Sequence, residues 1–331
     1  MNDLISIIVP IHNCEETIDR CLSSLTLQSY KNLEIILVEN GSTDQSLSIC
    51  QQWSNRDSRI KILVSSLGVS NARNEGLEHI NGDFFAFVDA DDYVDCSIYE
   101  KLYNKISQEN ADMSFCRINN FFDDGHIQKS EEKNLSALLF EKKVFYWYSD
   151  GAESVRRVVW RTLFRRSVYD TIRFNTQIFF GEDRDYLQRC YLKSSKSTLV
   201  DEYLYYYYCN YFIPNYTAQK YYKERKIFSS RSSLTQNSEK FLNYFGYLDL
   251  AKEQRFKALI MCIEDSIIVE NKEYLKAVRE LYSDSYWKET NSKQYYKSYL
   301  KFHKNINERI KAFLVKFNLL KVFYILKHIK K

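Results

Sequence analysis

The first ninety residues contain four short apolar runs, each followed by a polar segment. The runs are rich in β-branched and aromatic residues, and they are nearly continuous instead of alternating between apolar and polar positions. A strand that is buried on both faces has this pattern, which is typical of parallel sheets. We therefore predict four parallel strands, at residues 4–11, 33–38, 60–64 and 84–88.

Apolar residues at helical spacing lie between these runs. One stripe consists of Ile18, Cys21, Leu22 and Leu25, and a second of Leu47, Cys50 and Trp53. The alternation of strands and helices predicts βαβ units and a doubly wound, Rossmann-like α/β sheet with helices on both faces. Ligands of such sheets bind at the carboxyl ends of the strands, so we expect a binding site in the polar loops that follow them.

Beyond residue 95 the pattern changes. Residues 97–109 predict a helix with Leu102 and Ile106 inward, and the charged segment from Phe121 to Asn134 predicts a loop. From about Ala218 onward the chain is typical of helices, without a recognisable motif. Acceptor choice or assembly into a homo-oligomer is a possible use of this helical part.

The composition indicates a folded protein with an uneven charge. Of 331 residues, 45% are hydrophobic, enough for a large core, and no two of the eight cysteines have CxxC spacing, which argues against a zinc knuckle. We expect a reducing, cytoplasmic setting without a signal peptide or a transmembrane span. Residues 301–331 carry nine Lys or Arg against one acid, a net charge of +8, and the rest of the chain carries −4. This asymmetry predicts a local anionic partner, not a protein that coats nucleic acid.

The stretch GDFFAFVDADDYV ends the fourth apolar run with three acids within four residues, Asp89, Asp91 and Asp92. Like charges this close repel each other, so the cluster indicates either a solvated turn or a bound cation. The sequence has neither GxGxxG nor GxxxxGK[ST], so neither a dinucleotide fingerprint nor a P-loop is supported.

Several blocks of the sequence resemble family 2 glycosyltransferases, which have the GT-A fold. The similarity is dense over residues 4–95, in SIIVPIHNCEETIDRCLSSLTLQSYKNLEIILVENGSTDQS, GVSNARNEGL and GDFFAFVDADD. It returns in VVWRTLFRRSVY, in FFGEDRDYLQRC and in the tyrosine run near 204–208. The order and spacing of these blocks are more specific than any one of them.

The resemblance implies a metal site at Asp89-Ala90-Asp91. In that family the motif holds Mg²⁺ or Mn²⁺ against the diphosphate of a nucleotide sugar, which agrees with the preference of hard cations for oxygen ligands. Asp91 is then the direct ligand, Asp89 lies toward the ribose and bound water, and Asp92 is expected to cap a helix.

The first loops would form the donor pocket. The residues that the resemblance places there are Pro10, His12, Glu15, Glu39, Asn40, Asp44, Arg73 and Asp89. Glu39 stands where most relatives have an Asp that contacts the base or ribose, and His12 stands where they have a Tyr that stacks on uracil. UDP is the expected nucleotide. The alternatives are a polar strand-end role for His12 and a surface ion pair for Arg73, which otherwise lies near the diphosphate.

The motif Gly181-Glu182-Asp183 indicates the catalytic base. By resemblance Asp183 takes the proton of the acceptor hydroxyl and Glu182 orients the acceptor, which implies inversion at the anomeric carbon. Acids that merely favour a helix N-terminus are the alternative. Trp160 fits a sugar platform or the core, and the run Tyr205 to Tyr208, if a strand, alternates between two faces.

The C-terminal tail predicts a basic amphipathic helix. Its apolar stripe is Ile306, Ile310, Phe313, Leu314, Phe317 and Leu320, continued roughly by Phe323, Leu326 and Ile329. Such a helix lies in a membrane interface and is drawn to anionic lipid, or else it docks on the protein's own core or on another subunit.

Together these observations predict four parts. Residues 1–110 and 111–215 are the donor and acceptor halves of a GT-A domain, 216–300 are helical, and 301–331 are the tail. The expected activity is metal-dependent, inverting transfer from a nucleotide sugar to a glycan or lipid-linked glycan at the inner face of a bacterial membrane, for capsule, exopolysaccharide or O-antigen. The rivals are a nucleotidyltransferase, for which PIHNCEET lacks a basic triphosphate loop, and a catalytically silent glycan- or membrane-binding protein.

Overall fold

The computed structural model describes residues 3–131, 158–178, 181–209, 248–268 and 293–302, with the short pieces 233, 235–240, 243, 289–290, 309, 312 and 315. The chain forms two compact units. The first comprises Met1–Lys143, Ser154–Thr176 and Glu182–Pro214, and the second Val144–Glu153, Gln177–Gly181 and Asn215–Lys331. The four-part division expected from the sequence stays a prediction.

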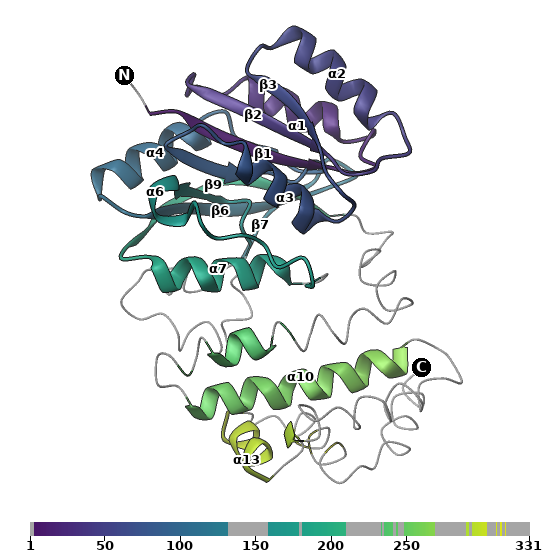
Figure 1. Ribbon diagram of the computed structural model, residues 1–331, viewed down its shortest axis with the longest axis vertical. Coiled ribbons are helices and arrows are strands. Elements are labelled where there is room, and N and C mark those ends of the chain that lie inside the picture. Colours follow the sequence, from purple (N-terminus) through teal and green to yellow (C-terminus); the bar gives the residue numbers. More distant parts are fainter. Residues whose placement is uncertain are drawn as a thin grey trace. The chain divides into compact units, whose positions relative to one another are not determined.

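The first unit is built on one mixed sheet of nine strands within the described residues, in the order β3-β2-β1-β4-β8-β6-β9-β5 with β7 beside β6. Figure 1 shows this sheet, with β1, β2, β3, β6, β7 and β9 labelled. The strands are β1 Ile5–Ile11, β2 Leu33–Glu39, β3 Ile60–Val64, β4 Phe84–Phe87, β5 Tyr93–Val94, β6 Met113–Phe122, β7 Ile127–Lys129, β8 Thr162–Arg165 and β9 Ser197–Cys209. The long pairings β1–β2, β2–β3, β1–β4 and β6–β9 are parallel, and the short ones are antiparallel. The predicted α/β fold of GT-A type is confirmed.

Six helices among the described residues of this unit surround the sheet: α1 Ile18–Thr26, α2 Ser46–Arg56, α3 Val69–Glu78, α4 Ile98–Gln108, α6 Arg166–Tyr169 and α7 Glu182–Lys193. The central strand β1 is buried on both sides. Ile5, Ile7, Val9 and Ile11 join the core with the apolar stripes of α1 and α4, and Ile8 meets Gly76 of α3. Burial on both faces explains why the apolar runs are continuous, and the predicted stripe of α1 is fully buried.

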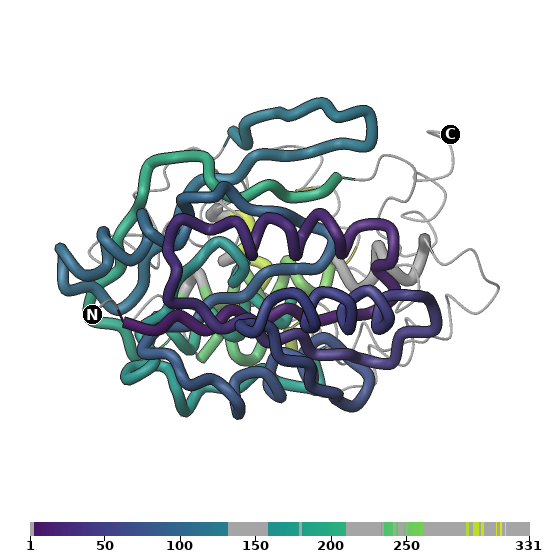
Figure 2. The backbone as a smooth tube through the Cα atoms, turned by 90° about the horizontal axis from the view of Figure 1, so that it is seen from above, coloured from purple at the N-terminus to yellow at the C-terminus, as the bar shows by residue number. Residues whose placement is uncertain are grey.

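One predicted loop is partly a β-hairpin. Strand β6 continues to Phe122, and β7 pairs with it from Asn119↔Lys129 to Phe121↔Ile127. This hairpin extends at the top of the view in Figure 2. All three residues of β7 are exposed, so the strand has no apolar pattern by which the sequence could have predicted it.

In the second unit, the described helices are α10 Leu248–Ile268 and α13 Lys293–Phe302, together with shorter helical pieces. They pack through Phe256, whose ring centre is 5.4 Å from that of Tyr299, and through Arg255, which donates to Thr290 and Tyr295, both at 2.7 Å. No helix among the described residues has both the length and the apolar character needed to cross a membrane.

The predicted apolar stripe of the tail lies outside the described residues. Two of its neighbours, Ala312 and Val315, are described, and both are fully buried. That part of the tail therefore lies against protein in this structure.

The packing of α3 on β1 leaves no room at Gly76. A Cβ there would stand 2.4 Å from Cγ2 of the buried Ile8. Gly→Ala inside a helix ordinarily adds about 1 kcal/mol of stability. Here we expect Gly76→Ala to lower the free energy of unfolding by about 1–3 kcal/mol through overpacking, measured by urea denaturation. Ser48→Ala, at an exposed position of α2, is the control and should stay within about 0.5 kcal/mol. A stabilised Gly76→Ala protein would contradict the close approach.

Candidate active site

The loops at the carboxyl ends of β1, β2 and β4 lie side by side, because these strands are neighbours in one parallel sheet. The loop after β1 is tied to the loop after β4, where Thr17 Oγ1 donates to the carbonyl of Ala90 at 3.1 Å. It is also tied to the loop after β2, where the N–H of Cys14 donates to Ser46 Oγ at 2.8 Å. One continuous polar edge results.

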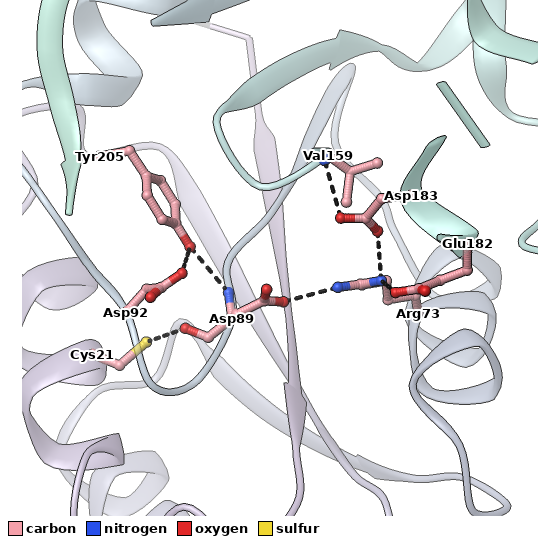
Figure 3. Close-up of polar contacts among 8 residues, drawn as sticks. All are labelled: Cys21, Arg73, Asp89, Asp92, Val159, Glu182, Asp183 and Tyr205. Carbon is pink, nitrogen blue, oxygen red and sulfur yellow. Dashed lines mark hydrogen bonds and ion pairs between the residues drawn. The ribbon is translucent and has the colours of Figure 1, made fainter. Parts of the chain in front are cut away.

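At this edge the buried guanidinium of Arg73 binds three carboxylates (Figure 3). Its Nη2 donates to Asp89 at 2.9 Å, and its Nη1 donates to Glu182 at 2.9 Å and to Asp183 at 2.7 Å. Only 3% of the Arg73 side chain is exposed, and the Phe174 ring lies 5.2 Å from its guanidinium carbon. The alternative of a surface ion pair for Arg73 is therefore excluded. The residue joins the acid motif after β4 to the acid motif that opens α7.

Asp183 is held at both oxygens. Its Oδ1 accepts from Arg73, and its Oδ2 accepts from the backbone N–H of Val159 at 3.5 Å. Burial raises the pKa of Asp183 to about 8, with help from the charges of Glu182 and Asp89 and against the opposing charge of Arg73. A carboxyl group whose pKa is raised in this way is suited to accept a proton near neutral pH. Gly181, two residues before Asp183, has φ +82°, a left-handed conformation that glycine adopts without steric strain.

The sequence predicts that Asp92 caps a helix, and this prediction is wrong. Its side chain is fully buried and accepts from the Tyr205 hydroxyl at 2.7 Å and from the backbone N–H of Tyr208 at 2.7 Å. The Tyr205 hydroxyl in turn accepts from the N–H of Asp89 at 3.3 Å (Figure 3). Strand β9 therefore holds the acidic loop after β4 in place.

Asp91, in contrast, is exposed. Crowding by the surrounding protein and the negative charge of Asp89 together raise the pKa of Asp91 to about 6, although part of its surface reaches solvent. No ion pair to its carboxylate is found among the described residues; Arg20 donates only to its backbone carbonyl, at 2.8 Å. A carboxylate left in this state is stabilised by any cation that reaches it.

The polar residues of the first two loops mostly bind one another. Asp44 accepts from the N–H of Glu15 at 3.1 Å, and Glu15 accepts from the N–H of Gln45 at 2.8 Å. The Asn40 side chain, buried, donates to Ser65 and Ser66 and accepts from the N–H of Gly68. Pro10 lies half-buried near the end of β1, paired in register with Val38. The structure thus brings all the predicted donor residues to this edge, and many of their side-chain groups shape the loops.

Trp160 and the tyrosine run form a core, not an open sugar platform. Trp160 is buried and stacks on Tyr205 and Tyr207, with ring centres 4.2 and 5.3 Å apart. Tyr206 instead stacks on Tyr93, with ring centres 4.4 Å apart. The expected alternation along β9 is confirmed.

Two supporting residues escaped the sequence analysis. From the sequence, Tyr205 is expected only to belong to an alternating strand, and Arg20 has no expected role. The Arg20 guanidinium lies among the rings of Tyr93, Phe121 and Tyr208 at 4.7–5.6 Å and donates to the backbone of the acidic loop. The four consecutive tyrosines were a signal for Tyr205, but no pattern marks Arg20.

Comparisons with known proteins place the chain. The family model described as Glycosyl transferase family 2 matches residues 6–190. The glycosyltransferase EpsJ of Bacillus subtilis (strain 168), itself uncharacterised, is 29% identical over 267 residues, which are 76% of this chain and 74% of that protein.

Two solved structures show the same fold at low identity. S. aureus TarS 1-349 in complex with UDP-GlcNAc aligns with a TM-score of 0.56 at 19% identity, over 90% of this chain and 91% of that one. The mannosyltransferase PcManGT from Pyrobaculum calidifontis, in complex with GDP-Man and Mn²⁺, aligns with a TM-score of 0.51 at 15% identity, over 96% and 88%. Since the family model covers more than half of the sequence, the chain belongs to glycosyl transferase family 2 and is a glycosyltransferase.

Proposed function

We propose that this glycosyltransferase is metal-dependent and inverting, and that it moves a sugar from a UDP-sugar to a hydroxyl of a glycan or lipid-linked glycan. The observation that carries the proposal is the cluster around Arg73. It brings Asp89, from the acid motif after β4, together with Glu182 and Asp183, which lie more than ninety residues later in the chain. The carboxylate assigned to the donor and the two assigned to the acceptor thus bind the same guanidinium.

The charges of the site suit a divalent cation. Asp89, Glu182 and Asp183 share a single arginine, and Asp91 stands beside them with its pKa raised. Among the residues that the structure describes, no group of three or more His, Cys, Asp or Glu side chains could hold a metal ion by itself. That agrees with a hard cation held by one or two carboxylates, with phosphate oxygens and water completing its shell. Asp91 and Asp89 would hold the ion, which would offset the charge that grows on the leaving diphosphate.

Asp183 is proposed as the general base. Its carboxylate, fixed by Arg73 and Val159, accepts the proton of the acceptor hydroxyl as the oxygen attacks the anomeric carbon. Glu182, on the same Arg73 nitrogen, orients the acceptor. A single displacement of this kind inverts the anomeric configuration, so an α-linked donor gives a β-linked product.

Neither rival function gains support from the structure. The family assignment favours glycosyl transfer over nucleotidyl transfer. A silent scaffold has no need to keep a carboxyl group with a pKa near 8 between an arginine and two other acids.

The two adjacent acids should separate metal binding from folding. We expect Asp91→Ala to abolish Mn²⁺-dependent binding of UDP in calorimetry without changing the melting temperature, because the side chain is exposed. Asp92→Ala is the contrast: it leaves the Tyr205 hydroxyl and the Tyr208 N–H without their buried acceptor and should cost about 1–3 kcal/mol of stability. If neither Asp91→Ala nor a chelator changes the UDP affinity, the cation site is refuted.

Removal of the basicity of Asp183 should stop transfer but spare donor binding. Asp183→Asn is nearly isosteric, so we expect the turnover number to fall by at least about 10²-fold while UDP affinity stays within a few-fold. Asp201→Asn, at an exposed position of β9, is the control and should change neither the turnover number nor the UDP affinity. Wild-type turnover in Asp183→Asn would move the role of base to another residue.

The pH profile gives an independent check. Because the pKa of Asp183 is raised to about 8, its base form is depleted as pH falls below that value. We therefore expect kcat/KM to drop by about tenfold per pH unit on the acid side and to level off above about pH 8. Asp183→Asn should lose this fall of kcat/KM at low pH. If the same fall persists in the variant, another group titrates in it.

We propose a cytoplasmic location at the inner face of the membrane, in synthesis of a cell-surface polysaccharide. The support is the +8 charge of residues 301–331.

Because Ala312 and Val315 are buried, truncation of the tail would disturb the fold, and charge neutralisation is the better test. Replacement of Lys321, Lys327, Lys330 and Lys331 by Gln should weaken binding to anionic vesicles by at least about tenfold at low salt, since each lysine contributes on the order of 1 kcal/mol. Equal co-sedimentation of both proteins would rule out the electrostatic anchor.

A further inference from the structure

The two acidic loops of this edge are held in opposite ways. In the loop after β2, the carboxylate of Glu39 accepts from the backbone N–H groups of Gly41, at 3.0 Å, and of Ser42. Beside it, the exposed His12 places Nδ1 3.0 Å from the carbonyl oxygen of Asn40, to which it can donate. Polar side chains of these loops thus bind nearby main chain. In the loop after β4, the main chain is bound by side chains of another element, and one carboxylate is left open.

Three successive carbonyl groups of the loop after β4 each accept a hydrogen bond from a side chain of α1 or of its N-cap residue. The pairs are Cys21 with Asp89 at 3.7 Å, Thr17 with Ala90 at 3.1 Å and Arg20 with Asp91 at 2.8 Å. Figure 3 shows the first of these bonds. Burial raises the pKa of the Cys21 thiol well above its usual value, so the sulfur keeps the proton that it donates. Positions 17, 20 and 21 have the i, i+3, i+4 spacing of one helix face, so a single face of α1 binds the whole turn.

This arrangement divides the work between two neighbouring acids. The buried Asp92 carboxylate is occupied by the Tyr205 hydroxyl and by the N–H of Tyr208. Asp91 is fixed through its carbonyl, and its side chain is exposed. The Asp91 carboxylate therefore has no part in holding the loop.

Arg20 is itself held by three aromatic rings. Its guanidinium carbon lies 4.7 Å from the ring centre of Phe121, 5.2 Å from that of Tyr208 and 5.6 Å from that of Tyr93. The rings stand on β6, β9 and β5, so elements on separate strands fix the position of the guanidinium. Aromatic faces attract a guanidinium through their quadrupoles. The donor to the Asp91 carbonyl is thus fixed by the sheet as well as by α1.

We propose that Arg20 is a positioning residue for the divalent cation: together with Thr17 and Cys21 it holds the main chain of residues 89–91, so that the Asp91 carboxylate stays in one place and available to the metal. This inference rests on the proposed metal site at Asp91. Arg20 acts only through the main chain of that ligand.

The charge of Arg20 works against this role, which gives the test a sign. Burial and Asp89 raise the pKa of Asp91, and the positive charge of Arg20 opposes them. A positive charge that acts on this carboxylate also repels a metal ion beside it. If Arg20 acted only as a charge, its removal would strengthen Mn²⁺ binding. If it positions the loop, its removal weakens Mn²⁺ binding.

Two substitutions remove the hydrogen bonds to the loop separately. Arg20→Met keeps an unbranched side chain among the rings but has neither donor nor charge. Thr17→Val is nearly isosteric and changes no charge, and the Thr17 side chain makes no capping hydrogen bond that could be lost. We expect the Mn²⁺ concentration for half-maximal UDP binding to rise by about tenfold in Arg20→Met and by about threefold in Thr17→Val.

Two further variants complete the comparison. Arg20→Lys keeps a charge and a donor without the planar guanidinium, so the required Mn²⁺ concentration should rise less than in Arg20→Met. Arg56→Gln, at the exposed end of α2, removes one positive charge far along the chain from the loop and should leave the Mn²⁺ requirement unchanged.

The measurement is calorimetric titration of each full-length protein with UDP at a series of Mn²⁺ concentrations, beside its melting curve. A raised Mn²⁺ requirement in Arg20→Met and Thr17→Val, with wild-type UDP affinity restored at saturating Mn²⁺, would support the inference. A merely structural role would lower the melting temperature and leave a loss of UDP binding that saturating Mn²⁺ does not restore.

An unchanged or lowered Mn²⁺ requirement in Arg20→Met would overturn the inference, as would a loss of UDP binding in a folded variant that Mn²⁺ does not restore. If Arg20→Met fails to fold, Arg20→Lys and Thr17→Val decide by the same criteria. Wild-type protein that binds UDP equally with and without Mn²⁺ would refute the metal site of the proposed function, and the inference with it. That failure is distinct because it is seen without any variant.

Discussion

One buried arginine shared by three carboxylates organises the site. Arg73 lies on α3, which packs closely on β1 through Gly76. The Arg73 side chain is almost fully buried. A buried guanidinium is costly unless it is paired, and buried carboxylates are equally costly, so each requires the other. Asp89 and the pair Glu182 and Asp183 therefore stay together although they come from distant parts of the sequence. The same sharing leaves excess negative charge, which adds to burial in raising the pKa of Asp183 and suits a further cation at Asp91.

Around this cluster, the rest of the first unit acts as a support. Tyr205 on β9 connects Asp92 to the backbone of Asp89, and Trp160 stacks behind Tyr205. On the other side, the loops after β1 and β2 bind each other through Glu15 and Asp44. A site fixed in this way can hold carboxylates at short range without letting them separate, since each loop has at least one hydrogen bond to its neighbour.

Local patterns allowed prediction of the elements but not of the partners. The continuous run at β1 and the stripe Ile18, Cys21, Leu22 and Leu25 predicted strand and helix, because burial acts on each residue where it stands in the pattern. The role of Asp92 was misjudged because its partners lie 113 and 116 residues away on β9. Likewise, a sequence motif could place Glu39 at the end of β2, but could not show that the longer side chain reaches the N–H groups of its own turn. Strand β7 was missed because its exposed residues carry no apolar signal.

We propose above all that the carboxylate cluster receives a divalent cation together with a nucleoside diphosphate. Anomalous diffraction from crystals grown with Mn²⁺ and UDP tests it most directly, because the signal locates the metal without reference to activity. We expect a manganese peak at about 2.0–2.3 Å from a carboxylate oxygen of Asp91, in contact with the diphosphate. UDP bound at this edge of the sheet without a manganese peak, or a peak away from Asp91, would contradict it.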